Sequence, residues 1–255
     1  MPTELTVDEH IAGFDAAVAR GADAAWAAGL DAPVPTCPDW NVRQLVAHVG
    51  MVHRWSAVQL TGTGDVVNGA ELEAAGLADP DPIAWWVTGA DELSVTMRDA
   101  PDDVQAMVFL NDAPPPRQFW ARRQCHEATI HAVDALAAQL GRPPQADEAG
   151  IADHIAIDGI DELLCGFLTR GRKLAVATER RLAVCPDGAS PSWTITLTEG
   201  SPVTVRHAPG TDIDADEMLT GPAVGLYLAL WNRGDLHADA STVSWWRDVA
   251  RIRWS

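Results

Sequence analysis

The pattern of apolar and polar positions predicts helices in the first part of the chain. Thr6-Val-Asp-Glu9 has the form of a capping box, and Ile11, Phe14 and Val18 follow at helical spacing. Three-proline stretches and glycines interrupt this pattern, as expected for loops between helices. We therefore expect a four-helix bundle, with helices over residues 7–29, Trp40–Leu60 (capped by Asp39), Pro82–Arg98 (capped by Asp81) and Arg117–Leu140 (ended by Gly141).

The pattern changes after residue 150, where short runs of β-branched residues appear between turn signals. Two of these runs, WTITLT and PVTVRH, alternate as half-buried strands do. The sequence therefore predicts an α+β fold with two domains: a bundle over 1–145 and a smaller α+β domain with an antiparallel sheet over 150–255. In the second domain we expect helices over Ile151–Leu168 and Asp216–Asn232 and strands over 174–178, 181–186, 193–198 and 202–207.

Charge and composition narrow the classes of partner. The 255 residues carry a formal net charge of -18, so neither a nucleic acid nor an anionic membrane surface is an expected partner. No stretch approaches the roughly 20 apolar residues of a membrane span, and the N-terminus lacks a signal-peptide pattern, so we expect a cytoplasmic protein. Four scattered cysteines without a CxxC pair predict neither disulfides nor a cysteine-ligated zinc site.

The segment RRQCHEATIHAVDA, residues 122–135, contains the candidate chemistry. It resembles the H-E-x-x-H motif of zinc peptidases, but His126 and His131 are five residues apart and diverge by about 140° on a helix. Glu127 and His131 are four apart and share a face, so both could bind one zinc or similar divalent ion. Asp134, one turn further, could orient the site. The pair could equally be a surface pair, or His131 a hydrogen-bonded core histidine.

A metal site would need a third ligand from another helix. The second expected helix offers two histidines: His48 lies in line with Leu45 and Val52, and His53 lies in line with Val46 and Val49. Both positions have the spacing of a core face, where an imidazole needs a partner. Periodicity alone leaves both candidates open.

Four motifs in order along the chain resemble the mycothiol-dependent maleylpyruvate isomerase-like family, whose N-terminal part is a DinB-like four-helix bundle. They are VPTCPDWNVRQLVAHVGMVHRW (34–55), RRQCHEATIHAVDA, DGIDELLCGFLTRGR (158–172) and TGPAVGLYLALWNRGD (220–235). The resemblance implies His48, Glu127 and His131 as metal ligands, and so favours His48 over His53. It also implies a catalytic role for Arg233, although Asn232 replaces the glycine of the family's Leu-Trp-Gly-Arg. Arg233 could instead be a surface arginine at a helix C-terminus.

Two imidazoles and one carboxylate would leave open positions on a divalent metal, best matched by zinc, which is typical of catalytic sites. No cysteine of the chain is placed to supply a thiolate, and the resemblance implies mycothiol as an external thiol. We therefore expect an isomerase of maleylpyruvate or a similar unsaturated acid. A mycothiol S-transferase acting on another electrophile and a non-catalytic metal- or small-ligand-binding protein are the alternatives. The expected partners are a low-molecular-weight thiol and a small electrophile, bound by a monomer or homodimer.

Overall fold

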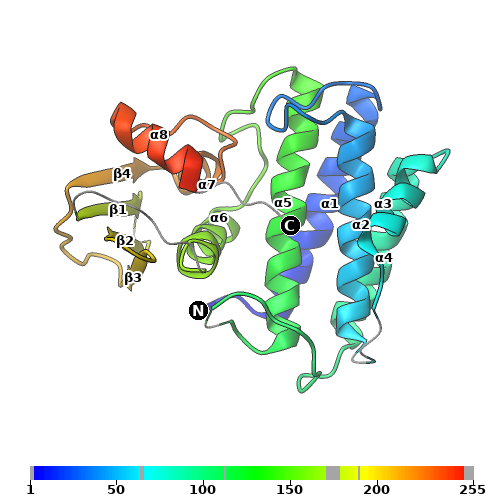
Figure 1. Cartoon of the computed structure of the whole chain (residues 1–255), viewed down its shortest axis with the longest axis horizontal. Helices are drawn as coiled ribbons and strands as arrows, with labels where there is room; N and C mark the ends of the chain where they lie inside the picture. The colour runs from blue at the N-terminus through cyan, green and yellow to red at the C-terminus, as the bar shows by residue number, and fades with distance from the viewer. Residues whose placement is uncertain are drawn as a thin grey trace. The chain divides into compact units, whose positions relative to one another are not determined.

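The computed structural model describes residues 3–61, 63, 66–111, 113–170, 179–188 and 190–249, the side chains of 248 and 249 excepted. The chain divides into two compact units. The first, called the bundle unit, comprises residues 3–109 and 114–144, and the second, called the C-terminal unit, comprises mainly residues 145–255 with 110–113 (Figure 1). The α+β class expected from the sequence is confirmed.

The bundle unit contains the four long helices expected from the sequence. Asp81 caps the third of them as predicted, by accepting from the Ala84 backbone, and the Thr6–Glu9 capping box is present. The predicted cap Asp39 is wrong: Asn41 caps the second long helix in a capping box with Gln44, because its side chain reaches the N–H three residues on. The helices are α1 (Val7–Ala28), α2 (Val42–Leu60), α4 (Pro82–Asp99) and α5 (Pro116–Leu140).

A fifth helix, α3 (Gly69–Ala78), was not expected. Its sequence, GAELEAAGLA, has no amphipathic pattern, and of its residues only Gly76 is buried, so the segment looked like a Gly-rich connection. Within the unit, α1 packs mainly along α5, and α2 lies against both α3 and α4 (Figure 1). The apolar core draws on all four long helices, with Ala25, Leu45, Trp86 and Ala135 among its buried members.

The C-terminal unit starts with α6 (Asp153–Asp161), which continues as a π-helix over Glu162–Phe167. A four-stranded sheet follows in the order β3-β2-β1-β4. Trp193 of β2 donates its indole N–H to Asp161 at 2.8 Å, and Thr204 of β3 donates to the Leu164 carbonyl, so this helix lies against one face of the sheet. The strands are β1 (Arg180–Pro186), β2 (Ser192–Leu197), β3 (Val203–His207) and β4 (Glu217–Gly221).

The three predicted strands that fall on described residues pair antiparallel, as expected; the fourth, 174–178, lies outside the described residues. The single helix predicted over 216–232 is wrong. Its first residues form β4, which pairs parallel to β1, so the sheet is mixed and not wholly antiparallel as predicted. Helix α7 (Ala223–Leu230) begins only after Pro222. Proline restricts the residue before it to extended conformations, so Gly221-Pro222 separates strand from helix.

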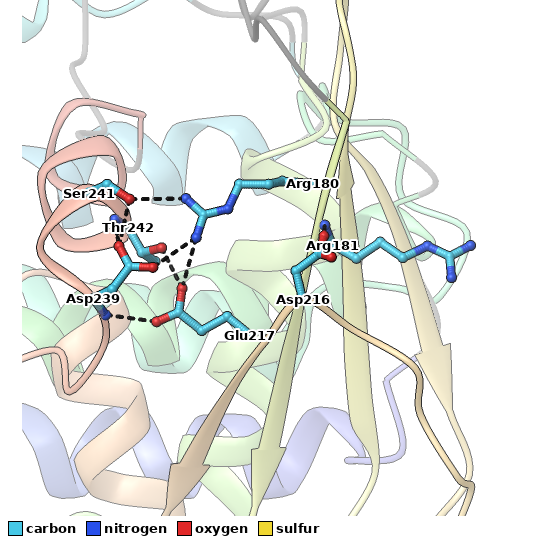
Figure 2. Close-up of polar contacts among 7 residues, drawn as sticks. All are labelled: Arg180, Arg181, Asp216, Glu217, Asp239, Ser241 and Thr242. Carbon is cyan, nitrogen blue, oxygen red and sulfur yellow. Dashed lines mark hydrogen bonds and ion pairs between the residues drawn. The ribbon is translucent and has the colours of Figure 1, made fainter.

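A last helix, α8 (Ala240–Val249), is fixed to the sheet by a polar cluster (Figure 2). Asp239 caps the helix by accepting from the Thr242 backbone N–H at 2.8 Å. The guanidinium of Arg180 lies 2.9 Å from Asp239 and 3.3 Å from Glu217 of β4. Glu217 in turn accepts from the Asp239 backbone and the Thr242 hydroxyl (Figure 2). These contacts explain why so short a helix has a defined place on the sheet.

Among the helices of the described residues, none combines the length and the apolar character required to cross a bilayer.

Candidate metal centre

Three side chains from two helices of the bundle unit converge on one point. Glu127 and His131 are one turn apart on α5, and His48 faces them from α2, with potential ligand atoms of all three within 4.8 Å of one another. His131 Nε2 lies 3.2 Å from Glu127 Oε1. Two ligands on a tetrahedral zinc ion are separated by about 3.3 Å, given bonds of roughly 2.0 Å. The spacing of this pair therefore matches two donors to one ion.

Glu127 is buried and its carboxylate is held in place from its own helix. Arg123, one turn before it, donates to Oε2 at 2.9 Å, which leaves Oε1 directed to His131. Burial alone would raise the pKa of Glu127, but the hydrogen bond with His131 and the positive charges of His131 and Arg123 outweigh it and hold the pKa well below its usual range. The carboxylate therefore stays ionised, which is the form that binds a cation.

His131 is placed between two carboxylates. Its Nδ1 lies 2.9 Å from Asp134 Oδ2, and its Nε2 faces Glu127. Burial would lower the pKa of this imidazole, but the hydrogen bonds to Asp134 and Glu127 have the larger combined effect and raise the pKa to about 9. Without a metal, a proton on Nε2 thus bridges to Glu127. A cation bound at this point would replace that proton while Asp134 continued to hold Nδ1.

His48 closes the cluster from α2. Its ring centroid lies 5.5 Å from that of His131 and 4.8 Å from Trp40, so the Trp40 indole covers both imidazoles. Burial and the neighbouring His131 lower the pKa of His48 to about 4, which keeps it in the neutral form that binds metals. Its Nδ1 lies 3.7 Å from Glu73 of α3. Because α3 was not expected, no sequence signal pointed to Glu73.

The other sequence candidates lie outside this cluster. His53, the alternative to His48, packs edge-on against Phe14 in the core, and burial lowers its pKa to about 3. The ring of His126 faces His10, 6.2 Å away. Cys37 is nearer than the sequence suggested, since its thiol lies 3.5 Å from Asp134 Oδ2. It contacts the residue that holds His131 and is not one of the three clustered donors.

Arg233, the predicted catalytic arginine, belongs to the C-terminal unit, whereas the three clustered donors belong to the bundle unit. It follows α7 and is half-buried, with its guanidinium donating to the Trp231 carbonyl at 2.9 Å. Its backbone N–H bonds to Leu228, and Asn232 N–H bonds to Ala229, which together form a Schellman motif. Its role in catalysis stays a prediction.

The donor set fits a divalent metal such as zinc. Zinc binds both neutral imidazoles and ionised carboxylates, and the cluster offers two of the first and one of the second. Three protein ligands leave a coordination position open for a further molecule. The neighbours Arg123, Trp40 and Asp134 orient or cover these donors. Arg123 had a detectable signal, four residues before Glu127, but the sequence does not show that Trp40 lies over the imidazoles.

Comparison with known proteins places this geometry in a family context. The family model described as "Mycothiol maleylpyruvate isomerase N-terminal domain" matches residues 11–136. The crystal structure of the mycothiol-dependent maleylpyruvate isomerase is similar with a TM-score of 0.61 and 18% identity, covering 94% of this chain and 96% of that one. A histidine-to-alanine variant of that enzyme gives a TM-score of 0.63 at 17% identity, with the same coverage.

A search of curated proteins gave no match. The two solved structures are too distant in sequence to show more than a shared fold, which extends over both units of the chain. The matched residues include most of α1, all of α2, α3 and α4, and most of α5, with His48, Glu127 and His131 among them. The motifs, the family match and the shared fold agree, and the chain belongs to the mycothiol-dependent maleylpyruvate isomerase-like family.

Proposed function

We propose that this chain is a metal-dependent enzyme that uses the thiol of mycothiol to isomerise maleylpyruvate or a similar cis-unsaturated acid. The observation that carries the proposal is the convergence of His48, Glu127 and His131 in a bundle of this family. The same three residues would hold the metal, which we propose is zinc. A bound zinc ion would lower the pKa of a coordinating thiol and so supply a thiolate at neutral pH.

The residues around the cluster favour an external thiolate over a fourth ligand from the protein. Glu127 contributes one negative charge, so one external thiolate would neutralise a divalent cation. The Cys37 thiol donates to Asp134, and Cys125 is buried on α5 two residues before Glu127. The nucleophile is therefore proposed to come from mycothiol, whose name the related enzymes carry.

The reaction proposed for this thiolate is a reversible addition. Sulfur bonds to one carbon of the conjugated double bond, and the electron pair of the π-bond moves toward the neighbouring carbonyl. The former double bond is then single and rotates, and loss of the same thiol restores the double bond in the trans form. No atom is gained or lost overall, so mycothiol is regenerated in each cycle.

The decisive experiment adds zinc and then mycothiol to the purified protein and follows the thiolate by its ultraviolet absorbance as pH is varied. We expect the pKa of the bound thiol to fall only in the zinc-loaded protein. Maleylpyruvate is then supplied: fumarylpyruvate formed without thiol consumption supports the isomerase, whereas thiol consumed into an adduct shows an S-transferase. Zinc and thiol bound without either product shows a binding protein, and an unshifted thiol pKa contradicts both enzymes.

The ligand assignment is tested by two histidine variants of α2. His48→Ala is expected to lower zinc affinity by about 100-fold or more, since it removes one of three protein ligands. His53→Leu serves as the matched control and is expected to bind zinc as wild type does. Equal affinity of wild type and His48→Ala would contradict the assignment.

Arg233 is proposed to bind a substrate carboxylate in bidentate fashion. Arg233→Ala is expected to lower kcat/KM for maleylpyruvate by about 100-fold, the order of a lost charge-assisted contact. Zinc affinity and the thiol pKa should not change. Arg233→Lys keeps the charge but not the fork of donors, so its activity should lie between the two. An Arg233→Ala enzyme with full activity would show that this side chain has only a local structural role.

A further inference from the structure

The loop between α1 and α2 contacts the candidate metal centre at two places. It is closed on itself: Val34 N–H bonds to the Trp40 carbonyl, Trp40 N–H bonds to Cys37, and Pro33 forms a bridge with Asn41. The first residues of α2 hold it as well, since Val42 N–H bonds to Ala32 and Arg43 N–H bonds to Leu30. One end of the loop carries Trp40, which covers the imidazoles of His48 and His131. Its centre carries Thr36 and Cys37.

Thr36 and Cys37 both reach Asp134. The Thr36 hydroxyl donates to Asp134 Oδ1 at 2.6 Å, and the Cys37 thiol lies 3.5 Å from Oδ2. Oδ2 also lies 2.9 Å from His131 Nδ1. Asp134 is fully buried, so a rotation of its carboxylate would break these bonds with no water to replace them. The loop thereby fixes the orientation of the carboxylate that holds His131.

The contact between Asp134 and His131 matches the hydrogen bond that metal-binding histidines commonly make through their second ring nitrogen. A hydrogen bond from Nδ1–H to a fixed carboxylate selects the tautomer with its lone pair on Nε2 and keeps the ring in one orientation. Here Nε2 is the nitrogen that faces Glu127. We propose that Thr36 is a positioning residue of the metal centre, acting through Asp134 on His131. The inference rests on the proposed metal site and extends it to the loop.

The test measures zinc affinity by competition with a chromophoric chelator, on the full chain. Thr36→Val keeps the shape of the side chain and removes its hydroxyl, and we expect about tenfold weaker zinc binding; Asp134→Asn should lose up to about 100-fold, the range for partners of metal-bound histidines. Thr36→Ser restores the hydroxyl and should return affinity to within about twofold of wild type. Thr96→Val is the control, because it removes a similar hydroxyl bond, to the Glu92 carbonyl of α4, outside the cluster.

Each outcome decides the proposal. Zinc bound by wild type and equally well by a folded Thr36→Val variant overturns the role of Thr36 and leaves the proposed function standing. Failure of wild type to bind zinc overturns both. A tenfold loss shared by Thr96→Val shows a general effect of stability and also overturns it. If Thr36→Val does not fold, Thr36→Ala takes its place, with the same expected loss of about tenfold and unchanged affinity as the contradicting result.

Discussion

Asn232 is a residue whose identity follows from its backbone. It has φ of 60°, and among the described residues it is the non-glycine residue in the left-handed region. It sits at the C′ position of the Schellman motif that ends α7, where glycine is favoured and asparagine is tolerated. The family pattern has glycine here, and asparagine in its place can adopt the same left-handed backbone conformation.

This conformation predicts opposite results for two substitutions. Asn232→Gly should change the free energy of unfolding by less than about 0.5 kcal/mol, because relief of the left-handed strain is offset by the greater entropy of the unfolded chain. Asn232→Val should destabilise by about 1–2 kcal/mol, since a β-branched side chain clashes at positive φ. Urea unfolding of the two variants measures this. Equal effects would mean that the left-handed conformation is not what the position requires.

The burial of His53 predicts that the stability of the fold depends on pH. Within the described chain neither of its ring nitrogens has a hydrogen-bond partner, and the side chain is fully buried. Its pKa is lowered from 6.5 to about 3, so the unfolded chain takes up a proton between these values and the folded chain does not. The contribution of His53 to the free energy of unfolding is therefore at its maximum above pH 6.5 and is lost as the pH falls toward 3.

The His53→Leu substitution removes this pH-dependent contribution to stability, while leucine fills nearly the same volume as histidine. Between pH 7 and pH 5, metal-free wild type should lose about 2 kcal/mol more unfolding free energy than the variant, at 1.36 kcal/mol per unit of pKa difference. At pH 7 the variant should be as stable as wild type or more stable, because an unbonded polar group leaves the core. Urea unfolding at both pH values measures the difference. Parallel pH dependence of the two proteins would show that His53 has a bonding partner in solution.

At the scale of elements, the packing of α2 against α4 depends on glycine. A Cβ on Gly50 would lie 2.3 Å from Cζ3 of Trp85 and 3.1 Å from the Trp86 backbone. The Trp85 ring cannot retreat easily: Arg54 stacks on it at 3.8 Å, and a Cβ on Gly76 of α3 would meet it at 2.6 Å. This ring therefore occupies the space that two glycines on different helices leave open.

Gly50→Ala should accordingly destabilise the protein by about 2 kcal/mol through overpacking, although alanine is the better helix former by about 1 kcal/mol. Gly225→Ala is the matched control. Gly225 lies in α7, where the added Cβ would meet Ala146 at 3.9 Å, an ordinary contact. There the helix propensity should dominate and stabilise by up to about 1 kcal/mol. Thermal unfolding of both variants gives the signs, and stabilisation by Gly50→Ala would contradict the packing argument.

The elements that could be predicted from the sequence are those with strong local signals. Capping residues and helical periodicity placed α1, α2, α4 and α5 to within a few residues of their observed ends. Elements whose form depends on neighbours were missed. β4 has only five residues, and its pairing with distant β1 is invisible locally. α3 and α8 are short, and α8 is fixed by side-chain contacts with β1 and β4 (Figure 2).

In the candidate site, too, the features with a local sequence signal could be predicted, and those set by tertiary packing could not. The i,i+4 spacing was enough to pair Glu127 with His131 on α5, and the structure brings His48 to them. Periodicity could not choose between His48 and His53, because both lie on inward parts of α2; the choice depends on how α2 faces α5. Contacts from Thr36, Cys37 and Glu73 come from a loop and a helix whose positions are set by tertiary packing. Local sequence carries no signal for such contacts.

At the scale of the whole molecule, every proposed metal ligand comes from α2 and α5, and both helices lie in the bundle unit. A ligand that binds only the folded state adds stability by mass action, about 2.7 kcal/mol at a free concentration 100 times its Kd. Zinc held by these ligands would join the two helices directly, so it should suppress the local openings that separate α2 from α5. Openings confined to the C-terminal unit involve no ligand and should not respond.

Hydrogen exchange followed by mass spectrometry on the full chain tests this expectation. Zinc should slow exchange in peptides from α2 and α5 by about 100-fold at 100 times Kd, while peptides from β1 to β4 should exchange as before. The effect should vanish with chelator and in His48→Ala. Equal slowing in the sheet would mean that the two units open together, and no slowing in α2 would mean that the metal is not held between the helices that carry His48, Glu127 and His131.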